Sequence, residues 1–217
     1  MKNCLPALFC VCLCSSLFLL AGCGNPKIDA AGSVKAIYDL YILGDTKGIT
    51  ALGMETEDIS AAQETYGNSL RDTIRKNFAE SGQQIDEAAL EELCAARKEA
   101  LSKMSATAEV TAESEGKATV VIRTTYFNES SLDEEAFYTA RQSAWKMDFP
   151  SLEKQQEFLM DAYTQNLIQS YQEVTPSEDT TAITVDCVIH NHIWMPANMS
   201  SFGADLAHAV TTPPGTE

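Results

Sequence analysis

The sequence predicts an α+β fold in which an antiparallel, curved sheet of three or four strands packs with several helices. Apolar residues recur at helical spacing over residues 33–104 and again over 132–172. Between these segments, and once more after residue 181, the period changes from 3.6 to 2, which is typical of strands. No repeat of fixed period is found, so we expect one domain with one core over residues 33–210.

Three helices are expected in the first half of the chain. The first begins with Ser33 as its cap and ends at Gly44, and the second covers residues 57–81. Asp86 caps the third, whose expected core side carries Leu90, Leu93, Cys94, Arg97, Leu101 and Met104.

A β-hairpin follows, because apolar and polar residues alternate from Ala106 and again after Gly116. If Gly116 takes the left-handed position of a three-residue loop, one register satisfies three cross-strand pairs. These pairs are Val110 with Val120, Ala112 with Ala118, and Glu113 with Lys117.

Two further helices are predicted over residues 132–148, capped by Ser131, and 151–172. Phe149 and Pro150 join them. A down-and-back helix pair returns the chain to the sheet, so we expect the strand from about residue 181 to run antiparallel to the strand of residues 118–127.

The last predicted strand is long and places His190, His192 and Trp194 on one face. Asn198 then caps a short helix, and residues 211–217 read as a frayed tail. Trp194 either seals the core beneath this helix or lines a ligand pocket, and the apolar side chains of the helix favour sealing.

The N-terminal segment has the pattern of a lipoprotein signal. Lys2 precedes an uncharged stretch of about 16 residues, which falls short of the roughly 20 that span a bilayer. The stretch ends in Leu20-Ala21-Gly22-Cys23, which resembles the lipobox of bacterial lipoproteins, whose thiol receives a diacylglyceryl group. The expectation is that residues 1–22 are removed, Cys23 is lipidated, and residues 23–32 form a tether at the extracytoplasmic face of the cell membrane.

The charge balance excludes several partners. The formal net charge of the 217 residues is -16, and removal of Lys2 with the signal would leave -17. Such a surface repels nucleic acid and anionic lipid headgroups, so we expect no nucleic-acid partner and membrane contact only through the acyl chains on Cys23.

Of the seven cysteines, Cys94 and Cys187 alone are left for the folded part once the signal and Cys23 are set aside. Both fall on apolar stripes, so two buried free thiols are expected, with a single disulfide between them as the alternative that an exported location permits.

The sharpest candidate metal site is the pair His190 and His192, about 6.6 Å apart on one predicted strand face. Asp186 lies too far along the strand to be a third ligand, and His208 would have to fold back over this face. A polar outer sheet face is the competing interpretation, and we predict no resident metal or cofactor.

No catalytic motif is found, so we expect a protein that is not an enzyme. The acidic clusters lie at helix starts or in loops, where they complement the helix dipole, and phosphate loops and a serine nucleophile elbow are missing from the sequence. Tyr163 and Tyr171 are expected in the core. Three hypotheses stay open: a binding module for a small molecule, peptide or envelope protein in the concavity of the sheet, a metalloenzyme centred on the two histidines, and an inhibitor or assembly factor.

The chain as a whole resembles a large group of uncharacterised lipoproteins from Gram-positive-type bacteria. The resemblance rests on the lipobox, the short tether, the run Tyr38-Asp39-Leu40-Tyr41 into Gly44-Asp45, and strands ending near Trp194. It implies a cystatin-like fold, of the kind seen in nuclear transport factor two, and carries over no catalytic residue.

Overall fold

The computed structural model describes residues 26–80 and 82–215. Its helices are α1 (Ala30–Tyr38), the π-helical turn η1 (Asp39–Leu43), α2 (Lys47–Ala51), α3 (Thr56–Glu80), α4 (Glu87–Ser102), α5 (Glu129–Ala144), α6 (Leu152–Gln172) and α7 (Met199–Thr211). Its strands are β1 (Ala106–Ser114), β2 (Lys117–Thr124), β3 (Thr181–His190) and β4 (Ile193–Pro196). The predicted α+β class is confirmed.

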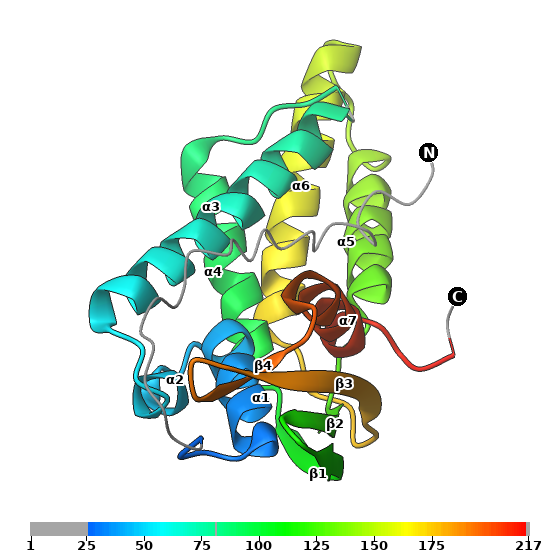
Figure 1. The fold of residues 1–217 in the computed structure, drawn as a ribbon. Helices are drawn as coiled ribbons and strands as arrows, with labels where there is room; N and C mark the ends of the chain where they lie inside the picture. Colours follow the sequence, from blue (N-terminus) through cyan, green and yellow to red (C-terminus); the bar gives the residue numbers. More distant parts are fainter. Residues whose placement is uncertain (1–25, 81, 216–217) are drawn as a thin grey trace.

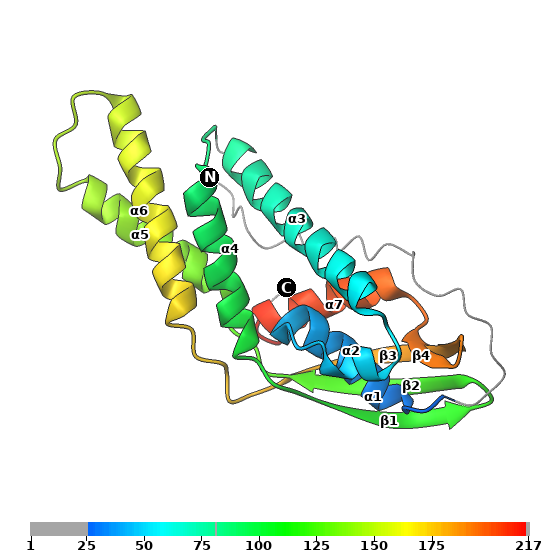
Figure 2. The ribbon, with the colours of Figure 1, turned by 90° about the vertical axis from the view of Figure 1, so that its left-hand side faces the viewer.

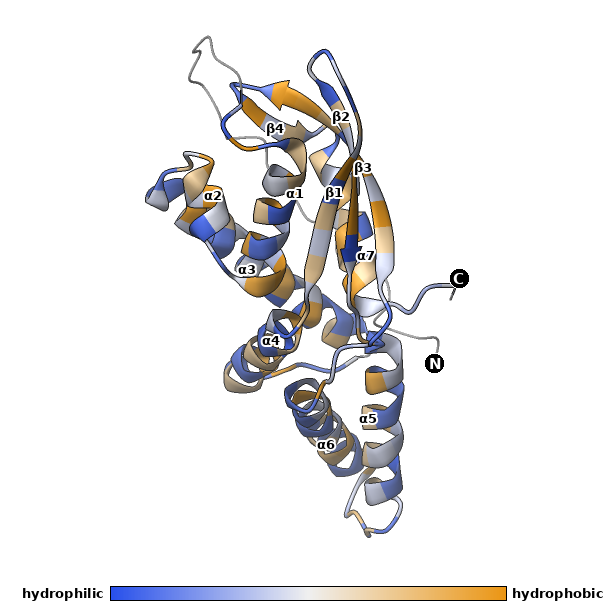
Figure 3. Ribbon diagram, turned by 90° about the horizontal axis from the view of Figure 1, so that it is seen from below, coloured by the Kyte–Doolittle hydropathy of each residue, from blue (hydrophilic) through white to orange (hydrophobic). Residues whose placement is uncertain are grey.

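The four strands form one antiparallel sheet in the order β1-β2-β3-β4. Strand β3 pairs antiparallel with β2, as the helical-hairpin argument predicts. Helices α5 and α6 pack side by side, and after α6 the chain returns to the sheet. Helix α6 also packs against α4, and α4 packs against α3, so that α3, α4 and α6 form a helical layer (Figures 1 and 2). Hydrophobic and hydrophilic residues alternate around these helices, as in amphipathic helices (Figure 3).

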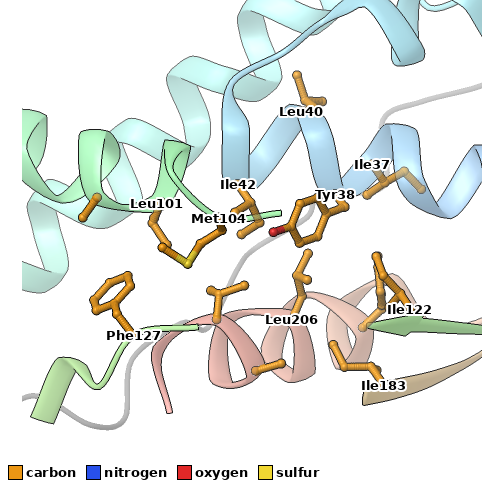
Figure 4. Packing of buried hydrophobic residues seen from close by; sticks show 14 of the residues in the cluster. Ile37, Tyr38, Leu40, Ile42, Leu101, Met104, Ile122, Phe127, Ile183 and Leu206 are labelled. Atoms are coloured by element: carbon orange, nitrogen blue, oxygen red, sulfur yellow. The ribbon is translucent and has the colours of Figure 1, made fainter. Parts of the chain in front are cut away.

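The core lies between the inner face of the sheet and the helices α1 and α7. Tyr38 of α1, Leu206 of α7 and Ile122 of β2 converge there (Figure 4), and all three are buried. The Tyr38 hydroxyl shares a 2.8 Å hydrogen bond with the Thr124 hydroxyl, which satisfies both groups inside the core. Helices α1 and α7 therefore cover the inner face of the sheet with buried apolar side chains.

Two helix starts differ from the sequence-based prediction. Helix α1 begins at Ala30, where Asp29 accepts a hydrogen bond from the Gly32 amide, and Ser33 is buried inside the helix instead of capping it. The expected tether is correspondingly shorter. Helix α5 begins at Glu129 after the cap Asn128, whose side chain accepts from the amide of Ser131. In both cases an Asp or Asn further upstream offers the carbonyl-type acceptor that a cap needs.

Other predicted boundaries are confirmed. Asp86 caps α4, Ser151 caps α6, and Asn198 caps α7, each by accepting from a backbone amide of the first turn. The first helix ends at Gly44, which adopts a positive φ of 72°. A single π-helical turn precedes it, and the short helix α2 after it was not predicted.

The β1–β2 hairpin has a different register from the predicted one beyond Val110. Val110 faces Val120 as expected, but the register shifts there, so that Ala112 faces Thr119, Glu113 faces Ala118 and Ser114 faces Lys117. Thr111 is the extra residue of this β-bulge, and its hydroxyl donates to the Thr119 carbonyl at 3.1 Å. The loop consequently has two residues, with Gly116 in the predicted left-handed conformation at φ 75°.

Candidate functional site

The predicted long strand after residue 181 is a hairpin, and this separates the two candidate metal ligands. Asn191 and His192 both have positive φ values, 49° and 64°, which is the backbone of a two-residue type I′ turn. Trp194 pairs with Ile189 across the turn. His190 ends β3 and His192 lies in the turn, so the prediction that they share one strand face is wrong.

Metal ligands do not gather elsewhere in the described chain either. Among residues 26–80 and 82–215, no group of three or more His, Cys, Asp and Glu side chains is placed to hold a metal ion. His208 lies on α7 and is exposed. Cys23, the predicted lipid attachment residue, lies outside the described residues.

Cys94 and Cys187 are both buried and both free, as expected from their apolar stripes. Burial, together with the charge of Asp186, raises the pKa of the Cys187 thiol to about 11. Burial also raises the pKa of Cys94. A thiol with a raised pKa and no access to solvent is a poor nucleophile, so neither residue has the setting of a catalytic cysteine.

The most concentrated acid–base chemistry lies inside the helical layer. Arg97 of α4 binds Glu129 of α5 through two hydrogen bonds, Nε to Oε1 at 2.7 Å and Nη2 to Oε2 at 3.1 Å. The Tyr171 hydroxyl of α6 donates to the same Glu129 oxygen at 2.6 Å. Tyr66 of α3 completes this cluster, which we call the buried polar cluster. Four helices therefore meet at one charged pair.

Electrostatics in the buried polar cluster favour a structural role. Burial, followed by the charge of Glu129, raises the pKa of Tyr171 well above its usual value of 10.0. Burial also raises the pKa of Tyr66, which Arg97 partly opposes. Both tyrosines consequently stay protonated, Tyr171 donates to Glu129, and Arg97, Glu129 and Tyr171 are all buried. Tyr163 and Tyr171 are buried, which confirms that they belong to the core.

A second carboxylate lies one helical turn further along α5. Asp133 accepts a hydrogen bond from the Tyr163 hydroxyl of α6. Burial raises the pKa of Asp133, although this bond lowers it. Tyr163 itself packs edge-on against Phe137, with 6.1 Å between ring centroids. The contact joins the two helices and is half-buried.

Sequence reasoning found only part of the buried polar cluster. Arg97 was placed correctly on the core side of its helix, and a charged residue on an apolar stripe is itself a signal for a buried partner. Glu129 was missed because the helix was expected to begin at Ser131, which left Glu129 in a loop.

A surface hollow of about 490 Å³ lies at the turn end of the β1–β2 hairpin. Its lining residues are Ala112, Glu113, Ser114, Lys117, Ala118, Thr119, Asp186, Cys187, Val188 and Ala197. Lys117 and Asp186 are exposed, and Asp186 already accepts the Thr119 hydroxyl at 3.1 Å. The hollow is open and lacks the convergent buried polar groups of a specific ligand site.

Exposed apolar side chains are most frequent at the end of the α5–α6 hairpin, residues 138–158, which we call the α5–α6 tip. Four of the five exposed large hydrophobic side chains among the described residues lie there: Tyr138, Trp145, Met147 and Leu152. Trp145 is 63% exposed and Leu152 is 77% exposed. Apolar side chains gathered in this way mark an interaction surface more often than isolated ones do.

The α5–α6 tip is an ordered structure. The Arg141 guanidinium lies over the Trp145 ring, 4.7 Å from its centre, and the rings of Phe149 and Phe158 pack at 5.4 Å between centroids. Ser151 caps α6 immediately after the loop. The exposed Trp145 is therefore held in place before any partner arrives.

Comparison with solved structures shows a similar fold in a Bacillus subtilis protein, YcdA, that is described as a candidate lipoprotein. The two structures superpose with a TM-score of 0.63 at 19% sequence identity, over 85% of this chain and 56% of that protein. This chain thus spans just over half of the length of its structural neighbour, and at this identity the likeness establishes the fold.

The sequence comparisons give a family but no characterised relative. No curated protein sequence matches the chain. A model of the family described as a domain of unknown function, DUF5105, matches residues 46–198, from the residue before α2 to the cap of α7. Since this match extends over more than half of the chain, the protein belongs to the DUF5105 family.

Proposed function

We propose that the protein is an extracytoplasmic lipoprotein, held at the cell membrane by a diacylglyceryl group on Cys23, and that it acts as a non-enzymatic interaction module. The proposal of an interaction module rests on a contrast between the interior of the protein and its surface. The acid–base groups of the buried polar cluster are held in structural hydrogen bonds, whereas exposed apolar side chains gather at the α5–α6 tip.

Two observations support the lipid anchor. The lipobox cysteine lies only three residues before Pro26, and helix α1 follows at Ala30, so the folded domain begins directly after the attachment site. The fold is similar to that of YcdA, which is described as a candidate lipoprotein. Within residues 26–80 and 82–215, no helix is both long enough and apolar enough to cross a membrane.

A cystatin-like fold, which the sequence resemblance implies, is also part of this proposal.

Metabolic labelling with palmitate tests the anchor. Wild type and a Cys14→Ser control, which changes a thiol inside the proposed signal, should both be labelled and sediment with membranes. Cys23→Ser should stay unlabelled and uncleaved, because no other thiol occupies the lipobox position. Equal label on Cys23→Ser and wild type would contradict the proposal.

Native mass spectrometry of residues 24–217, prepared without lipid, tests the non-enzymatic part. The proposal predicts a retained small molecule, peptide or protein, or the bare chain, and no stoichiometric zinc. Zinc bound at one ion per chain and lost in His190→Ala would favour a metalloenzyme instead.

A further inference from the structure

We propose that the α5–α6 tip is a self-association surface, and that its partner is the tip of a second copy of this chain anchored in the same membrane. This inference rests on the proposed lipid anchor at Cys23. It names the partner and the residues through which the interaction module acts.

The α5–α6 tip lies far from the end of the molecule at which the proposed lipid anchor is attached. The first described residues, dark blue in Figure 1, lie beside α1 and the sheet, whereas the tip lies at the other end of the molecule in both Figure 1 and Figure 2. Helix α6 alone is 21 residues long, about 32 Å, while the three steps along the chain from Cys23 to Pro26 reach at most about 10 Å. A lipid on Cys23 therefore holds the exposed Trp145 away from the bilayer, so a protein surface is the better occupant.

Charge selects a second copy as that protein. The whole chain carries -16, yet the α5–α6 tip holds three cations, Arg141, Lys146 and Lys154, and three anions, Asp148, Glu153 and Glu157. Lys154 already pairs with Glu157 within the tip. The α5–α6 tip is therefore balanced in charge, so the same surface of a second copy can approach it without the repulsion that the acidic remainder of the chain would cause.

The geometry also explains why such a contact would depend on the membrane. Stable interfaces use about 20 to 30 residues on each side, more than the α5–α6 tip exposes, and the acidic bodies of two copies repel each other. Anchoring in one plane raises the effective concentration and aligns the two long axes, so a weak contact between tips is populated there. In dilute solution the chain should be monomeric.

Site-specific disulfide trapping in cells tests this arrangement with the full lipidated chain. Gln156→Cys places an exposed thiol on α6, one turn after Leu152, and Gln63→Cys places a thiol at another exposed position, on α3, as the matched control. The native Cys94 and Cys187 are buried and do not compete. After mild oxidation, we expect a disulfide-linked dimer from Gln156→Cys at about tenfold the yield of Gln63→Cys.

Two second-site changes identify the contact. Trp145→Ala and Arg141→Glu, each in the Gln156→Cys background, should lower the dimer yield about tenfold, since exposed aromatic and arginine side chains carry most of the energy of such contacts. Equal yields from Gln156→Cys and Gln63→Cys, or a yield insensitive to Trp145→Ala, would overturn the proposal. A crosslink from Gln156→Cys to a different protein, or a blue shift of Trp145 emission on vesicles, would overturn it in favour of another occupant.

Palmitate labelling of the same samples separates the two proposals. Palmitate-labelled protein that gives no Gln156→Cys dimer would contradict the self-association proposal and would leave the lipid anchor intact. Unlabelled protein contradicts the lipid anchor. Dimers formed at the wild-type yield by residues 24–217 with Gln156→Cys, prepared without the signal and the lipid, would show that the contact does not depend on the membrane and would overturn the argument from anchoring in one plane.

Discussion

Arg97 and Glu129, which are 32 positions apart in the sequence, form a buried two-bond ion pair at the point where four helices meet. The pair joins α4 to the first turn of α5, where the negative charge of Glu129 also complements the helix dipole. Tyr171 holds the same carboxylate from α6. The ion pair thus fixes how the helical layer packs, and the α5–α6 hairpin projects from this point.

Removing one partner of this ion pair should destabilise the protein strongly. Arg97→Met leaves the Glu129 carboxylate buried without its cation, and we expect a loss of about 3 to 5 kcal/mol in the free energy of unfolding, measured by urea denaturation. Arg75→Met, which breaks an exposed pair with Glu87, is the control and should cost less than about 1 kcal/mol. Similar losses in both variants would show that the buried pair has no special role.

The carboxyl of Asp133 should make stability depend on pH. Burial raises its pKa above the usual 3.8, so the folded chain holds this proton more tightly than the unfolded chain does. The stabilisation is complete below pH 3.8 and is lost as pH rises through the raised pKa. Wild type should therefore lose stability relative to Asp133→Asn over this window, in urea titrations at a series of pH values. Asp72→Asn, at an exposed position, is the control, and a constant difference between wild type and Asp133→Asn would contradict the expectation.

Trp194 should behave as a core residue. It is 5% exposed on β4, which packs against α1 and α7, so the prediction that it seals the core is confirmed. We expect Trp194→Ala to cost roughly 3 to 5 kcal/mol, whereas Trp145→Ala at the exposed tip should change stability by less than about 0.5 kcal/mol. In a Trp145→Phe background, the emission of Trp194 should be blue-shifted. Water-like emission and unchanged stability would place the ring at the surface.

The turn between β3 and β4 offers a stabilising substitution. Asn191 and His192 both adopt positive φ, and Asn-Gly is the preferred pair for a type I′ turn. His192→Gly should therefore raise the free energy of unfolding by up to about 1 kcal/mol. His192→Val, which introduces a β-branched side chain, should lower it. Calorimetry distinguishes these outcomes, and destabilisation by both variants would indicate that the imidazole itself contributes more than the backbone strain costs.

Much of the fold follows from local patterns in the sequence. The period of apolar residues places α3, α4, α6 and the two central strands, and Asp86, Ser151 and Asn198 act as the expected caps. The antiparallel pairing of β2 and β3 follows from the down-and-back helices between them. These features depend on neighbouring residues or on chain connectivity, which a sequence displays directly.

The features that sequence reasoning missed depend on competition between similar signals or on distant contacts. Asp29 and Ser33 are both good caps, and tertiary burial of Ser33 decides between them. The alternation through residue 194 fits one long strand as well as two short ones, and only the positive φ of Asn191 and His192 turns the chain. The α5–α6 tip was not predicted, because the exposure of Tyr138 and Trp145 depends on what packs against the helical hairpin and not on the local sequence pattern.

The intact mass of the protein extracted from membranes tests the central claim most directly. Lipidation at Cys23 predicts the mass of residues 23–217 plus a diacylglyceryl group, with the modified residue at the N-terminus. A membrane-bound species with the mass of unprocessed residues 1–217, or a mature chain whose Cys23 is unmodified, would contradict the account.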